Sequence, residues 1–114
     1  MAYDDKLAQR VRVLIAANKG FSEKKMFGGI AFLLFGKMCC GVLKDDLVVR
    51  INLGDYGRAL NKLHVRRMDF TGRPMKGYVY VGLEAIRTAR SLRAWLDKSI
   101  GFVTSLPETK KTKK

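Results

Sequence analysis

The stretch "KKMFGGIAFLLFGKMCCGVLK" (residues 24–44) decides the fold, because it is almost entirely apolar and yet is interrupted by turn residues. Gly28-Gly29 and Gly36-Lys37 separate its short apolar runs, and Asp45-Asp46 divides it from "LVVRIN". Glycines between apolar runs are typical of tight β-hairpin turns that need a positive φ. The pattern predicts a meander of four strands, at about residues 24–27, 29–35, 38–44 and 47–52.

A membrane-spanning helix does not fit the same stretch. The uncharged run from Met26 to Gly36 is too short to span a bilayer, and Lys37 would lie near the middle of any longer segment. The N-terminal "MAYDDKLAQR" also lacks the basic and apolar regions of a signal peptide. We therefore expect no membrane association. With only two cysteines in the chain, which are adjacent, we expect a reducing, cytoplasmic location.

The adjacent Cys39 and Cys40 are weak candidates for a redox or metal site. Neighbouring side chains of a strand point to opposite faces, so the two thiols should not share a metal ion or form an unstrained disulfide. His64 is the single histidine and there is no C-x-x-C motif, so the usual structural zinc ligands are missing. We expect one thiol in the core, the other partly exposed, and no metal.

Motifs for catalysis or cofactor binding are not found in the sequence. No G-x-S-x-G motif accompanies His64, and the glycines of "GRPMKGY" (72–78) are not followed by the Ser or Thr of a phosphate-binding loop. The aspartates at 45, 46 and 69 lie in turn-like settings. We therefore expect a non-enzymatic protein without a cofactor.

The segments around the meander complete a prediction of the α+β class. A first helix should begin at Asp4-Asp5 and end near Asn18 or Lys19, and a middle helix should cover 54–64. Two further extended pieces are expected at 68–70 and 77–81, and an apolar stripe from Ala85 to Val103 predicts the last helix. We expect one domain at 1–106, with an antiparallel sheet flanked by these helices, and a disordered lysine-rich tail at 107–114.

The formal net charge of +13 makes nucleic acid or an acidic protein a candidate partner. Phosphates could be neutralised by three arginines on one face of the last helix and by four basic residues elsewhere: Arg87, Arg90, Arg93, Arg66, Arg67, Arg73 and Lys76. Tyr78 and Tyr80 could stack on bases. Alternatively, the tyrosines are half-buried sheet residues and the arginines a solvated surface. The RNA-binding signature motif is missing, so a protein-interaction domain ranks ahead of a nucleic-acid binder.

Strand "GIAFLLF" is apolar on both of its faces, with Ile30, Phe32 and Leu34 on one and Ala31, Leu33 and Phe35 on the other. An antiparallel sheet with one wet face would show alternation. We therefore expect the centre of the sheet to be covered on both sides. Either the helices divide between the two faces, or a second copy or another protein covers one of them.

These landmarks together resemble the TfoX N-terminal domain family over residues 3–103. The similarity rests on the 26–29 turn, the 36–37 reversal, the strand ending at Arg50, the 72–75 loop, and the helix that carries Trp95. The resemblance implies a compact α+β domain, no catalytic residues, and a regulatory role. The family includes regulators of natural competence that assist a transcription factor at promoters. Those regulators carry a second, C-terminal domain, whereas this sequence continues into the lysine-rich segment.

Overall fold

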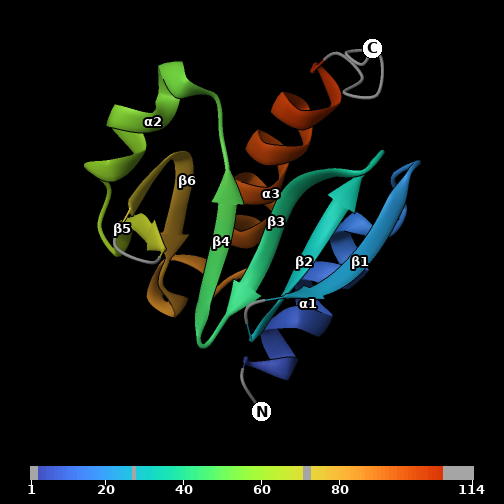
Figure 1. Cartoon of the computed structure of the whole chain (residues 1–114). Coiled ribbons are helices and arrows are strands. Elements are labelled where there is room, and N and C mark those ends of the chain that lie inside the picture. The colour runs from blue at the N-terminus through green and yellow to red at the C-terminus, as the bar shows by residue number, and fades with distance from the viewer. Residues whose placement is uncertain (1–2, 27, 71–72, 107–114) are drawn as a thin grey trace.

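A six-stranded antiparallel sheet runs through the molecule in the order β1-β2-β3-β4-β6-β5 (Figure 1). The structure is a computed structural model that describes residues 3–26, 28–70 and 73–106, except the side chains of residues 26, 68–70 and 73–76. The strands are β1 Phe21–Met26, β2 Gly29–Leu34, β3 Lys37–Leu43, β4 Asp46–Arg50, β5 Val65–Phe70 and β6 Arg73–Val81. The predicted meander is confirmed, and the tail predicted at 107–114 lies outside the described residues.

The turn between β2 and β3 shows why the strands end where they do. Phe35 and Gly36 both have positive φ, at 53° and 78°, which is the backbone of a tight hairpin whose twist matches its strands. Phe35 was expected to be the last residue of the strand, but it is the first residue of the turn. Its amide donates to the carbonyl of Gly20 at 2.9 Å, which holds this turn against the start of β1.

Side-chain caps set the helix boundaries more sharply than the apolar stripes do. Helix α1 covers Asp5–Ile15, α2 covers Leu53–Leu60 and α3 covers Ala89–Thr104, with a short 3-10 helix η1 at Leu83–Ile86. The last helix begins at residue 89, not at 85, because the Thr88 hydroxyl accepts from the Ser91 amide at 3.1 Å. The first two helices also end earlier than predicted, and His64 lies beyond α2 with a φ of 66°.

All three helices pack on one face of the sheet. One core cluster joins Phe32 of β2 to Val11 of α1, Ala59 of α2 and Leu96 of α3. Figure 1 shows α1 and α3 behind the sheet. The helices therefore do not divide between the two faces, and that part of the sequence prediction is wrong.

Two glycines let the central strands approach closely. A Cβ on Gly41 would lie 2.6 Å from the Ile30 carbonyl oxygen, and one on Gly29 would lie 2.5 Å from that of Val42. These contacts are with the backbone of the paired strand, which cannot move without breaking the ladder. Residues larger than glycine are therefore excluded at positions 29 and 41.

We predict that Gly41→Ala lowers the free energy of unfolding by roughly 1–3 kcal/mol, as in other overpacked interiors. The matched control is Gly57→Ala on α2, where a Cβ would meet open space. That change should raise the free energy of unfolding by about 0.5–1 kcal/mol, because alanine is the better helix former. Urea unfolding followed by circular dichroism measures both, and an unchanged stability of Gly41→Ala would contradict the packing described here.

Candidate functional site

The second face of the sheet, which we call the helix-free face, is the candidate functional site. Its members follow from the strand register, because cross-strand partners project to the same side. Ala31 pairs with Gly41, Gly41 with Val48, Val48 with Tyr80, and Tyr80 with Arg66. Lys24 extends this row, because it pairs with Ala31, and the flanking row on the same face holds Leu33, Met38, Arg50 and Tyr78.

The centre of the helix-free face is small and apolar. Ala31 and Val48 are only 2% and 3% exposed, yet neither belongs to the core cluster beneath the helices. On the same face Met38 lies over Gly41, with its Cε 3.3 Å from the position of a Gly41 Cβ. The centre is therefore a buried apolar layer on this side of the sheet, and the charged and aromatic side chains around it form the accessible part of the face.

Two arginines lie over the two tyrosines of this face. The Cζ atom of Arg66 is 4.9 Å from the Tyr80 ring centre, and the Arg66 guanidinium forms an ion pair with Asp46. Arg50 lies over Tyr78 at 5.7 Å and donates to the Met38 carbonyl at 3.3 Å. Such cation–π contacts hold a guanidinium in place while its outer edge still faces solvent. The face therefore presents positioned positive charges beside its apolar centre.

The structure brings together only some of the residues that the sequence singled out. Arg66, Tyr78 and Tyr80 share the helix-free face, whereas Arg67 projects to the opposite side because it pairs with Val79 of the core. Arg73 and Lys76 belong to β6, but their side chains lie outside the described residues.

The three arginines near the last helix do not share a surface with the tyrosines. Arg87 follows η1, and Arg90 and Arg93 are exposed on α3, away from its buried Leu92 and Leu96. Since α3 packs on the core face, the sheet separates these arginines from Tyr78 and Tyr80. The basic helix face and the tyrosine face are two different surfaces.

Arg50 belongs to this face, but it was not named as a candidate site residue from the sequence. The alternation in "LVVRIN" already placed it opposite Leu47 and Val49, so its side was predictable. Its contacts were not, because they involve Tyr78 and also the Phe102 ring of α3, whose centre is 5.6 Å from the Arg50 Cζ. Sequence pattern gives the side of a strand residue but not its neighbours.

A β-bulge turns both thiols toward the core. Phe32 pairs with Cys40 but Leu33 pairs with Met38, which leaves Cys39 as the extra residue of β3. Both cysteines are fully buried, so the expectation that one would be partly exposed is wrong. The hydrogen bond between the two thiols lowers the pKa of Cys39, and it raises the pKa of Cys40 together with burial.

Residues typical of a metal site or a membrane anchor do not gather in the described part of the chain. Among residues 3–26, 28–70 and 73–106 there is no group of three or more His, Cys, Asp or Glu side chains placed to hold a metal ion. No helix in these same ranges combines the length and the apolar character that crossing a bilayer requires.

Comparison with known proteins gives a match at the level of the family. The sequence model described as "TfoX N-terminal domain" matches residues 14–103, which contain the whole sheet, all of α2, and α3 except its last residue. No curated protein and no solved structure matches the chain.

We predict that neither thiol of the native chain reacts promptly with Ellman's reagent, because both are buried beneath α3 or its neighbours. Both should react at once in concentrated guanidinium. The variant Ser22→Cys, at an exposed position of β1, is the positive control and should add one fast thiol. A prompt reaction of one thiol in the unmodified native chain would contradict the bulge.

Proposed function

The chain belongs to the TfoX N-terminal domain family, and from this premise we propose that it is a non-enzymatic regulatory domain that binds an acidic protein partner through its helix-free face. The observation that carries the proposal is the sheet face that no described helix covers, on which Arg50 and Arg66 lie over Tyr78 and Tyr80. The family's link to competence regulation makes an accessory role in transcription or competence the natural setting.

The composition of the helix-free face supports a protein partner. Arg50 and Arg66 provide guanidinium groups on this face, and Tyr78 and Tyr80 provide partly exposed aromatic rings beneath them. Arginine and tyrosine are over-represented at the energetic centres of protein interfaces. The net charge of +13 would speed the approach of an acidic partner, and the guanidinium groups would then bind its carboxylates.

The edges of the sheet argue against the partner adding a strand. The edge strand β1 carries Glu23, Lys24 and Lys25, and the other edge, β5, carries Arg66 and Arg67. Charged edge strands discourage pairing with another chain. We therefore place the partner on the flat face.

Nucleic-acid binding is the alternative function, and the pair of tyrosines on one open face favours it. Each tyrosine, however, already lies beneath an arginine, so a base could stack only after that arginine moved. The arginines at 87, 90 and 93 lie across the sheet and could bind phosphates independently of the tyrosines. The two functions thus require different surfaces, which makes them separable by mutation.

We predict that the double change Lys24→Ala and Arg66→Ala weakens partner binding by about tenfold or more, since a hydrogen bond to a charged group is worth about 1.5–3 kcal/mol. The partner is first captured from nuclease-treated lysate, identified by mass spectrometry, purified, and titrated against the chain by calorimetry. Both replaced residues are on the helix-free face.

The matched control is Arg90→Ala with Arg93→Ala, which removes the same charge from the outer side of α3. This control should leave the affinity within about twofold, because exposed charges away from an interface contribute little. Two results together would favour nucleic-acid binding instead. These are a loss of the captured partner on nuclease treatment and a weaker affinity for nucleic acid in the Arg90→Ala, Arg93→Ala variant.

A further inference from the structure

A cavity of about 360 Å³ opens between α2 and α3, on the core side of the sheet and away from the helix-free face. Its walls come from the segment just after β4, α2, the loop after α2, and α3, and its lining residues are Ile51, Asp55, Arg58, Ala59, Asn61, Lys62 and Lys98. Clefts that bind small molecules in proteins start at roughly 300 Å³. The cavity is therefore large enough for a small organic ligand.

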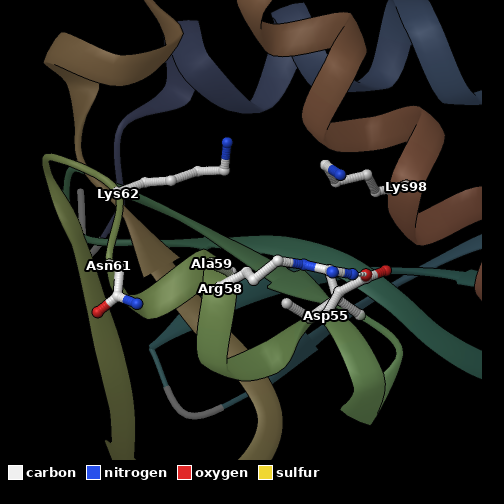
Figure 2. A pocket seen from close by; sticks show the side chains of 7 residues that line it. Asp55, Arg58, Ala59, Asn61, Lys62 and Lys98 are labelled. Atoms are coloured by element: carbon white, nitrogen blue, oxygen red, sulfur yellow. Dashed lines mark hydrogen bonds and ion pairs between the residues drawn. The ribbon is translucent and has the colours of Figure 1, made fainter.

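The charges in this cavity do not balance. Asp55 is the one acid among the described lining residues, and it already forms an ion pair with Arg58 at 2.5 Å. Lys62 and Lys98 extend toward one another across the gap between the two helices (Figure 2). Within the described part of the chain, neither ammonium group has a hydrogen-bond or ion-pair partner. Two positive charges thus face one space without an anion between them.

The floor of the cavity is apolar. Ile51 is 1% exposed and Ala59 is 4% exposed, and both belong to the core cluster. The exposed area of these two residues is small, so the organic part of a ligand would also contact the methylene groups of Arg58, Lys62 and Lys98, while its charged group stayed near the mouth. The arrangement suits an organic molecule with one strongly anionic group.

We propose that the cavity between α2 and α3 binds a small phosphorylated organic molecule, with its phosphate between Lys62 and Lys98. A phosphate monoester carries close to two negative charges near neutral pH and so matches two ammonium groups. Lysine binds phosphate as a compact point charge with rotatable donors, which tolerates the variable orientation of a flexible ligand. The organic part lies against Ile51 and Ala59.

Helix α2 gives the binding a structural consequence. It has eight residues and contains Gly54 and Gly57, so its intrinsic helix stability is low. A phosphate held by Lys62, just after α2, and by Lys98 of α3 would tie the two elements together. Binding should therefore slow the exchange of α2 amide hydrogens, which general screening of surface charge would not do.

The test is an NMR titration of the full chain, at constant ionic strength, with inorganic phosphate and separately with phenyl phosphate. We expect shifts confined to the cavity lining, tighter binding of phenyl phosphate than of phosphate, and slower α2 exchange. The variant Lys62→Met with Lys98→Met should weaken binding at least about tenfold, because two hydrogen bonds to a charged group are lost.

The matched control is Lys19→Met with Lys25→Met, which removes the same charge from exposed positions before and within β1. It should bind phenyl phosphate as the unmodified chain does. Equal weakening in both double variants, or shifts spread over the whole basic surface, would overturn the proposal. If the double variant unfolds, the single variant Lys62→Met, which lies in a loop, is used in its place. An affinity of Lys62→Met for phenyl phosphate equal to that of the unmodified chain would also overturn the proposal.

Discussion

The hydrogen bond from the buried Ser99 hydroxyl to the Cys39 carbonyl fixes how the last helix meets the sheet. The bulge leaves Cys39 without a cross-strand partner at the centre of the sheet, where an unpaired carbonyl would be costly. Ser99 satisfies that carbonyl from α3, and its oxygen also lies 3.1 Å from the Cys39 sulfur. The bulge at Cys39 therefore depends on Ser99 to satisfy its carbonyl, and the buried Ser99 hydroxyl depends on that carbonyl as its acceptor.

Several other features follow from this contact. Because the bulge adds one residue, it turns Cys39 toward the helices and leaves Met38 on the helix-free face, where it covers Gly41. The Met38 carbonyl in turn accepts from Arg50, whose guanidinium lies between Tyr78 and Phe102. A regular strand in place of the bulge would reverse the side of every residue on one half of β3.

Much of the fold was predictable because its signals are local. The turns at 28–29 and 36–37 depend on residues within them, and the apolar stripe of α3 depends on its own spacing. The bulge was not predictable in this way, since Cys39 and Cys40 look like ordinary strand residues and only the distant Ser99 explains them. The start of α3 at Ala89 was not predictable from the apolar stripe either, because the stripe carries no information about the capping hydrogen bond of Thr88.

The candidate site was predictable in its residue types but not in its geometry. Tyr78, Tyr80 and Arg66 were chosen for their chemistry, and the strand register does place them together. The arginines of α3 were grouped with these residues by charge alone. Periodicity assigns a residue to a face of its own helix or strand and does not say which side of the sheet that helix covers. Which side of the sheet a helix covers depends on long-range packing, such as that of Leu96 against the core.

Helix α3 links the two proposed surfaces. Lys98 lines the cavity, and the next residue, Ser99, contacts the bulge from which Met38 and Arg50 take their positions on the helix-free face. A ligand at Lys98 would change the affinity for a partner only by favouring one position of α3 over another. Because such coupling is reciprocal, the partner would then change the affinity for the ligand by the same factor. The contact between Ser99 and Cys39 is where such coupling would pass through the sheet.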